Sequence, residues 1–241
     1  MSSLSVVIPV GPAETELGEL PERLLHIFRY DEKLALQLRH WEIILVCCEA
    51  SRHLCRHLQD TRGVTVLCAE AGRAKQMNAG AAVASGGFIW FLHLDSDIEA
   101  LHCQQLSERM MHNSDALHYF PLAFRHDGAG PVLLNQWGAN LRSGLLGVPF
   151  GDQAFCLSAR SFARLGGYSE DASYGEDHLL VWHARQTGLP LCSVGIPLPT
   201  SARKYAAHGW LKLTFKYQYL WLKQAWPEWL YLLKLRFLQR N

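Results

Sequence analysis

The first half of the chain alternates short apolar runs with stretches of helical spacing. Four runs are mainly apolar and rich in β-branched or aromatic residues: 5–8, 43–48, 64–68 and 88–92. Helical spacing follows the first run, from Leu17 to Phe28, and an Ala-rich helical stretch, 73–84, precedes the fourth. Strands that are apolar on both faces are typical of a parallel sheet covered by helices on both sides. The sequence therefore predicts an α/β fold, with a mixed, mainly parallel sheet flanked by helices.

The second half has weaker periodicity and predicts shorter elements. We expect strands at 117–124 and 155–157 and helices at 132–146 and 176–187. Ser158 is predicted to cap a short helix that ends at Gly166-Gly167. Because no linker or repeat interrupts the pattern, we expect one domain over residues 1–208 and a helical tail over residues 209–241.

Composition and charge narrow the classes of partner. Hydrophobic residues make up 49% and charged residues 19% of the 241 residues, which is typical of a globular protein. The formal charge of +1 gives no reason to expect a nucleic-acid partner. No apolar run approaches the roughly 18 residues of a membrane-spanning helix, and the N-terminus has no signal-peptide pattern. We expect a cytoplasmic protein.

The cysteine pattern favours reduced, buried thiols over disulfides or a zinc site. Their number is odd, no C-x-x-C pair occurs, and most lie within apolar runs. The seven are Cys47, Cys48, Cys55, Cys68, Cys103, Cys156 and Cys192.

Two carboxylates follow the fourth apolar run, in the segment Asp95-Ser96-Asp97. Ligands of open α/β sheets bind beyond the carboxyl ends of the strands, which is where this segment is expected. Carboxylate oxygens suit Mg²⁺ or Mn²⁺, ions that also bind diphosphate oxygens. The alternative interpretation is a solvated turn that ends the strand.

Further segments, taken in order with Asp95-Ser96-Asp97, resemble the family 2 glycosyltransferases of GT-A fold. They are Ser5–Pro9, Gly72-Arg73-Ala74-Lys75-Gln76-Met77-Asn78-Ala79-Gly80, Gly151-Asp152-Gln153, Gly166-Gly167-Tyr168, Gly175-Glu176-Asp177 and Thr200-Ser201-Ala202-Arg203. The resemblance covers roughly residues 4 to 205 and is greatest to a compact bacterial subgroup. It implies a hexosyltransferase that moves a sugar from a nucleotide-sugar donor to an acceptor hydroxyl with inversion.

The resemblance also implies residue roles. Asp95 and Asp97 match the D-x-D motif that holds Mn²⁺ or Mg²⁺ on the donor diphosphate, with His208 or His93 as a candidate third ligand. Asp177 matches the general base that takes the proton of the acceptor hydroxyl. The alternative for Glu176-Asp177 is stabilisation of a helix N-terminus.

The remaining expected contacts are to donor and acceptor. Donor-binding residues are expected at Pro9, Glu49, Arg73, Lys75, Asn78, Asp95 and Arg203. Acceptor-binding residues are expected at Asp152, Gln153 and Glu176. For the basic residues an exposed helix face or loop is the alternative, and for Gly151-Asp152-Gln153 a simple turn.

One departure from the family keeps a rival function open. After the second apolar run the family carries an Asp-rich turn that recognises the base, whereas this chain reads Val46-Cys47-Cys48-Glu49-Ala50-Ser51. Glu49 is the candidate substitute. The rival is a catalytically inactive protein of the same fold that binds a nucleotide sugar. A nucleotidyltransferase is less favoured, because Val10-Gly11-Pro12-Ala13 lacks the Gly-rich, Arg-containing loop of that class.

The tail is basic and aromatic. Residues 209–241 hold six basic side chains and one acidic one, and Leu211, Phe215, Tyr219, Leu222 and Trp226 follow helical spacing. Pro227 is expected to begin a second helix. Two interpretations stay open: an amphipathic helix at the inner face of a membrane, serving a lipid-linked acceptor, or a stripe that packs on the catalytic domain or on a second subunit of a homo-oligomer.

Overall fold

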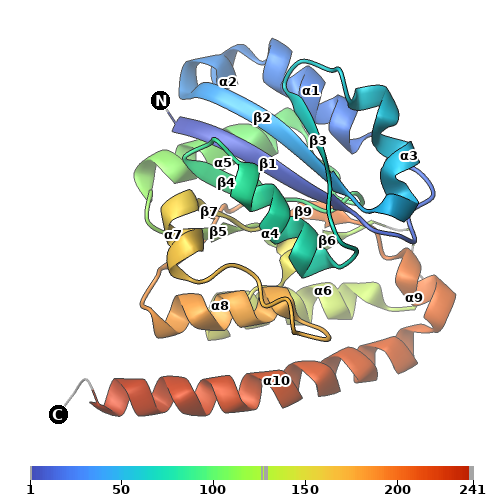
Figure 1. Cartoon of the computed structure of the whole chain (residues 1–241). Helices are drawn as coiled ribbons and strands as arrows, with labels where there is room; N and C mark the ends of the chain where they lie inside the picture. The colour runs from blue at the N-terminus through green and yellow to red at the C-terminus, as the bar shows by residue number, and fades with distance from the viewer. Residues whose placement is uncertain (1, 126, 128–129, 239–241) are drawn as a thin grey trace.

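A computed structural model describes residues 2–125, 127 and 130–238. Its centre is a seven-stranded sheet in the order β3-β2-β1-β4-β7-β5-β8 (Figure 1). Only β7 runs antiparallel to its neighbours in this sheet. The strands are β1 (Ser2–Val10), β2 (Leu38–Cys47), β3 (Val64–Cys68), β4 (Phe88–Phe91), β5 (Leu117–Tyr119), β7 (Cys156–Ser158) and β8 (Leu191–Ser193). The expected mixed, mainly parallel sheet is confirmed.

Helices cover both faces of this sheet. One face packs on α1 (Leu20–Tyr30), α2 (Glu32–Gln37), α3 (Arg52–Cys55) and α5 (Ala100–His112). The other packs on α4 (Arg73–Val83), α7 (Ala159–Arg164) and α8 (Glu176–Gln186). Strand β1 is apolar on both sides because Val6 and Ile8 enter the first core cluster and Val7 enters the second.

The stretch 117–124, expected as one strand, forms two strands in different sheets. β5 belongs to the main sheet, whereas β6 (Leu122–Phe124) pairs in parallel with β9 (Leu198–Thr200). Pro121 separates them, and because proline has no N–H to donate, it favours the departure of the chain from the main sheet. The single-strand expectation was wrong here.

Two helical expectations in this half are confirmed. Residues 132–146 are helical, as α6 (Val132–Leu141) followed by a π-helical turn, η3 (Arg142–Leu146). The turn closes at Gly147, whose φ of 61° is left-handed. Ser158 caps α7, since its hydroxyl accepts a hydrogen bond from Ser161 N at 3.0 Å.

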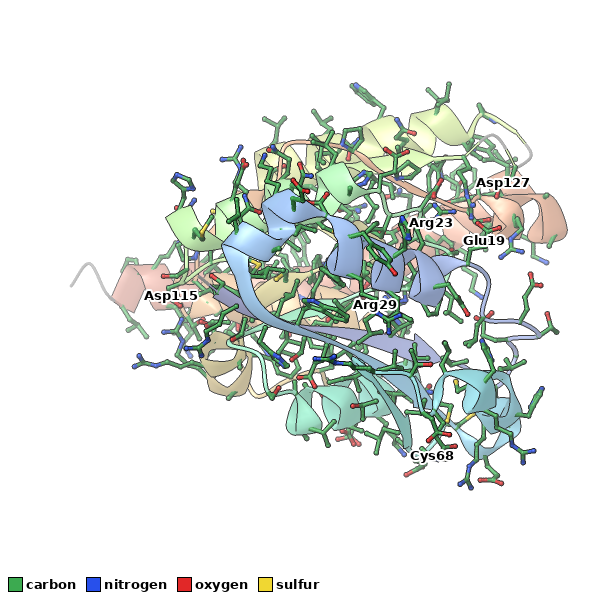
Figure 2. All side chains as sticks on the ribbon, turned by 90° about the horizontal axis from the view of Figure 1, so that it is seen from above. Glu19, Arg23, Arg29, Cys68, Asp115 and Asp127 are labelled. Carbon is green, nitrogen blue, oxygen red and sulfur yellow. The ribbon has the colours of Figure 1, made fainter. Side chains whose placement is uncertain are left out.

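The cysteines are all free, and five of the seven are buried. Cys68 is exposed at the end of β3 (Figure 2), and Cys192 on β8 is half-buried. Both strands are at the outer edges of the sheet, where one side lacks a neighbouring strand. The expectation of burial was wrong for these two residues.

The tail is one long helix, α10 (Trp210–Leu238), which lies along the base of the molecule (Figure 1). Pro227 lies inside this helix and does not begin a second one, contrary to expectation. Its side chain is exposed, so solvent can reach the carbonyl that loses its helical donor. Among the described residues, no helix is both long and apolar enough to cross a membrane.

Candidate functional site

The carboxyl ends of β1, β2, β3 and β4 lie at one edge of the sheet, where the predicted donor residues gather. Pro9 is buried near the end of β1. Glu49 begins the 3₁₀ turn η1 (Glu49–Ser51) after β2, and its side chain is 86% exposed, with Arg52 at 3.9 Å. The Asp95-Ser96-Asp97 turn follows β4 and is attached to β9, because Asp97 N donates to Pro199 O at 2.9 Å. This edge is open to a ligand at Glu49.

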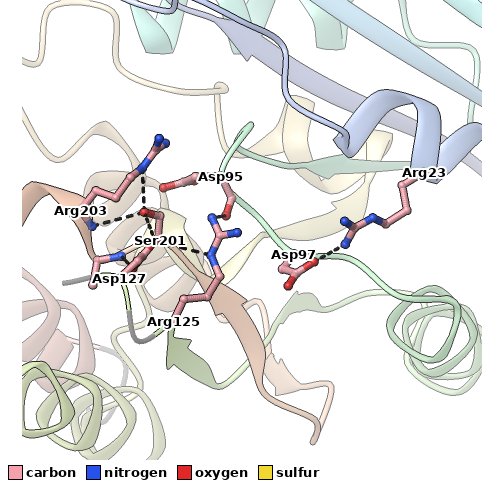
Figure 3. Close-up of polar contacts among 8 residues, drawn as sticks. Arg23, Asp95, Asp97, Arg125, Asp127, Ser201 and Arg203 are labelled. Atoms are coloured by element: carbon pink, nitrogen blue, oxygen red, sulfur yellow. Dashed lines mark hydrogen bonds and ion pairs between the residues drawn. The ribbon is translucent and has the colours of Figure 1, made fainter.

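The two carboxylates of the Asp95-Ser96-Asp97 turn point in different directions (Figure 3). Asp97 forms an ion pair with Arg23 of α1. The backbone carbonyl of Asp95 accepts a hydrogen bond from Arg125 Nη2 at 3.3 Å. Within the described residues, no contact engages the Asp95 carboxylate. The pair therefore does not form a two-carboxylate site in this conformation.

Of the two predicted carboxylate ligands, Asp95 and Asp97, only Asp95 offers a divalent cation a carboxylate that no described residue engages. No three His, Cys, Asp or Glu side chains gather into a metal site in the part of the chain that the structure describes. The side chain of His208 lies outside that part. Mg²⁺ accepts one carboxylate together with water and phosphate oxygens. Asp95 meets this requirement, whereas Asp97 would first have to leave Arg23.

The segment that holds Arg203 is organised by a carboxylate the sequence did not single out (Figure 3). Ser201 Oγ donates to Asp127 Oδ2 at 2.7 Å, and Ala202 N donates to Asp127 Oδ1 at 2.7 Å. Burial raises the pKa of Asp127, but these two hydrogen bonds outweigh that effect and lower it. Arg203, at the start of α9 (Arg203–His208), donates from Nε to Ser201 Oγ at 3.0 Å.

Several residues of the Gly72–Gly80 motif position helix α4. Gln76 is buried and donates to the carbonyls of Val10 at 2.9 Å and Val46 at 2.6 Å, at the ends of β1 and β2. At Gly80, a Cβ would overlap Val7 and Val46, so only glycine allows α4 to pack this closely on the sheet. The motif therefore fixes where Arg73 lies.

Asn78 and Lys75, both expected at the donor, are engaged with protein groups. Asn78 exchanges two hydrogen bonds of 2.9 Å with the backbone of Tyr168 and donates to Glu170 at 2.8 Å. Lys75 pairs with Glu70 at the surface. In this conformation, Asn78 holds the Gly167-Tyr168 loop in place.

Arg73 connects the sheet edge to the predicted general base. Its Nε lies 3.1 Å from Glu176 Oε1, and its Nη2 lies 3.5 Å from Asp177 Oδ2. Its Nη2 also lies 2.7 Å from His93 Nε2, which must accept because a guanidinium only donates. His93 precedes Asp95 by two residues, so Arg73 links the two ends of the site.

The Asp177 carboxylate is held ionised at the start of α8. Burial alone would raise its pKa, but Arg73 and the backbone N–H groups of Gly151 and His178, at 2.5 and 2.8 Å, bring it below its ordinary value. Glu176 behaves in the opposite way, because burial raises its pKa more than Arg73 lowers it. Asp177 can accept a proton at neutral pH.

Asp177 and Arg73 line a cavity of about 260 Å³. It lies between the segments around Arg73 and Asp177 and two helices, α6 and α10, and its lining is largely aromatic and apolar. Its aromatic members are Phe124, Phe150, Tyr174, Tyr205, Tyr217 and Trp221. Asp152, expected at the acceptor, also lines it. The C-terminal helix is therefore part of the site's wall.

Gln153, which was expected to bind the acceptor, is not among the residues that line this cavity. It is fully buried in the turn η4 (Gly151–Gln153) and bonds to Phe120 O at 2.9 Å and Ser143 Oγ at 2.7 Å. These bonds fix the turn that carries Gly151 and Asp152.

Arg142 and Gln224 are two of the polar cavity residues that were not predicted. Arg142 stacks on Phe150, with its guanidinium carbon 3.7 Å from the ring centre, and burial lowers its pKa. It is the only charged residue between Asp127 and Asp152, a signal visible in the sequence. Gln224 of α10 had no such signal.

Gln224 joins α10 to the segment around Asp177. His178 Nε2 accepts from Trp182 Nε1 at 2.8 Å, so Nδ1 carries the proton and donates to Gln224 Oε1 at 2.8 Å. Gln224 Nε2 in turn donates to Tyr174 O at 3.1 Å. Burial lowers the pKa of His178, which favours this neutral form.

Comparison with known proteins shows the fold but not a family. No protein-family model matches the chain, and no curated protein matches its sequence. Among solved structures, residues 1–349 of S. aureus TarS are similar, with a TM-score of 0.61 and 14% identity over 83% of this chain and 60% of that one. Its complex with UDP-GlcNAc gives 0.61 and 58% of that chain, and its complex with UDP gives 0.62 and 60%. The chain thus spans less than two thirds of these proteins and shares with them an α/β fold of GT-A type.

Proposed function

We propose that this protein transfers a sugar from a nucleotide-sugar donor to an acceptor hydroxyl, with inversion at the sugar. The observation that carries the proposal is the Asp177 carboxylate, held ionised by Arg73 in the wall of a cavity. The likeness to a protein solved with UDP-GlcNAc and with UDP supports a nucleotide-sugar donor. We place that donor at the carboxyl edge of the sheet, near Glu49 and Asp95.

In the proposed reaction, Asp177 takes the proton of the acceptor hydroxyl as its oxygen attacks the anomeric carbon. The bond between that carbon and the donor diphosphate breaks, and the diphosphate leaves with the electron pair. Arg73 orients Asp177 and keeps it deprotonated. A divalent cation bound at Asp95 would supply positive charge for the diphosphate that leaves.

The acceptor is proposed to occupy the cavity between α6 and α10. Asp152 is placed to contact it, and Phe150, Tyr217 and Trp221 provide ring faces for an apolar part or for the apolar face of a sugar. Glu176, expected at the acceptor, instead contacts Arg73 from a buried position. We propose that it positions Arg73.

Two measurements on the purified protein test this proposal. Thermal unfolding is followed with UDP, GDP and UDP-GlcNAc, with and without Mn²⁺, because a ligand that binds only the folded state raises Tm. Release of nucleoside diphosphate from each donor that binds is then measured. Binding with metal-dependent release supports the transferase. Tight binding without release from any donor would favour the catalytically inactive nucleotide-sugar-binding protein instead.

A further inference from the structure

The outer side of α10 is an apolar arc that no described part of the chain covers. Eight of its side chains are between 43% and 68% exposed. They are Leu211, Phe215, Tyr219, Leu222, Trp226, Trp229, Leu230 and Leu233. At about 100° per residue they fall within an arc roughly 100° wide. The stripe noted in the sequence therefore faces outward, and it does not pack on the catalytic domain.

The inner side of the same helix packs on the protein. Leu213, Ala225 and Leu232 are buried there. Gln224 bonds to His178 from this side. These contacts attach α10 to the domain through the side opposite the exposed arc.

Positive charge borders the arc, and negative charge does not. Lys212, Lys216, Lys223 and Lys234 lie along one border at helical spacing, and Arg236 lies at the other. All five side chains are exposed. Glu228, the only acidic residue of α10, faces inward and accepts a hydrogen bond from Gln186 Nε2 at 2.7 Å. The partner of this face should therefore be apolar and negatively charged at its rim.

A second helix beside the cavity repeats the same chemistry. α6 and η3 expose Leu133, Leu134, Trp137, Leu141, Leu145 and Leu146. Neither element contains an acidic residue. Exposed apolar surface on this scale marks an interaction site.

We infer that α10 docks in the plane of an anionic lipid bilayer, with its outer arc in the interface and its lysines at the phosphates. Trp and Tyr prefer the headgroup level, and lysines at the border of an apolar arc reach lipid phosphates. A second copy of the chain fits this face poorly, because its lysine border would meet another lysine border without an acid.

This docking, taken with the proposed function, assigns a class of acceptor. The cavity that Asp177 lines is also lined by Tyr217 and Trp221 of the same helix. An acceptor carried by a lipid would have its hydroxyl at Asp177 and its chain directed to the bilayer. Vesicle binding is measured without turnover, so docking and transfer can fail separately.

The test is flotation of the full chain with vesicles of phosphatidylcholine alone or mixed with phosphatidylglycerol, at low and high salt. We expect binding to the anionic vesicles that falls as salt rises. Each Lys→Gln change at 212, 216 and 223 is expected to weaken it about fivefold. The triple variant Phe215→Ser, Tyr219→Ser, Trp226→Ser should lose at least tenfold. The matched control, Tyr30→Ser, Leu36→Ser, Leu101→Ser, removes equally exposed apolar groups from α1, α2 and α5 and should bind as the parent does.

Three results would overturn the inference. The first is no binding to anionic vesicles at low salt. The second is equal loss in the control and in the α10 variant, which would indicate non-specific adsorption. The third is a stable dimer in light scattering that the α10 variant alone dissociates, which would assign the arc to a second copy of the chain.

Discussion

The carboxylate of Asp177 accepts a hydrogen bond of 2.5 Å from the backbone N–H of Gly151. A Cβ at position 151 would overlap both Asp177 Oδ2 and Arg73 Nη2, so the turn of η4 and the base fit together only with glycine there. The two residues are 26 positions apart and come from different elements. The geometry of the proposed base therefore depends on the absence of a side chain at Gly151.

Gly151→Ala is expected to lower kcat/KM for transfer at least tenfold, because the added methyl group displaces Asp177 from Arg73. Steady-state transfer with a donor identified by binding measures the loss. The matched control is Gly138→Ala in α6, where a Cβ meets no atom within 4 Å. That change should keep activity and raise the free energy of unfolding by about 0.5–1 kcal/mol. Equal activity of both variants would show that the contact at Gly151 is not required.

Arg73→Gln is expected to move the acid limb of the kcat/KM profile to higher pH. The guanidinium lowers the pKa of Asp177 against the effect of burial, so its removal raises that pKa and delays deprotonation of the base. Lys33→Gln, which breaks the surface pair with Glu108, should leave the limb in place. If the acid limb of the Arg73→Gln profile stays at the pH of the parent, Arg73 does not set the pKa of the base.

Gln224→Leu tests whether α10 supports the catalytic segment. The change leaves His178 Nδ1 and the Tyr174 carbonyl without partners, which costs about 1–3 kcal/mol in the free energy of unfolding. We also expect a higher KM for the acceptor, since Gln224 lines the cavity. Urea denaturation and acceptor kinetics measure the two effects. The control is Lys223→Leu at the exposed neighbouring position, whose free energy of unfolding should stay within about 0.5 kcal/mol of that of the parent. An equal loss of stability in both variants would contradict a specific role for Gln224.

Stability is expected to fall in mild acid because of a buried histidine. Burial lowers the pKa of His118 to about 4, so the unfolded chain takes up a proton below its ordinary pKa of 6.5 while the folded chain does not. The stabilisation is complete above 6.5 and is lost as the pH falls towards 4, on the order of 3 kcal/mol for this group. His118→Gln should remove this part of the slope in urea titrations between these pH values. A slope equal to that of the parent would show that His118 does not cause it.

The sequence predicted the elements that local pattern determines and missed those fixed by distant contacts. β1 to β4 and the helices α4 and α8 follow directly from apolar runs and helical spacing. The break at Pro121 was missed because β6 finds its partner, β9, far along the chain. The exposed Cys68 depends on β3 being an edge strand, which strand order alone determines.

The site was predictable as a set of residue types but not as a network. Asp177, Arg73 and Asp95 were singled out, yet the sequence does not reveal that Arg73 contacts both His93 and Asp177. Asp97 was expected to act beside Asp95, whereas Arg23 engages it from α1. Pairings across 74 positions of chain depend on how α1 packs against the sheet edge. Gln224 was missed because its role exists only when α10 folds back on α8.

The measurement that tests the central claim most directly compares the parent with Asp177→Asn. Binding of the donor is measured by the rise in Tm, and turnover by release of nucleoside diphosphate in the presence of acceptor. The account predicts unchanged donor binding and at least a hundredfold loss of transfer, because asparagine keeps the shape of the side chain and cannot take the proton. Transfer at a rate near that of the parent, in a variant that binds donor normally, would contradict the assignment of Asp177 as the base.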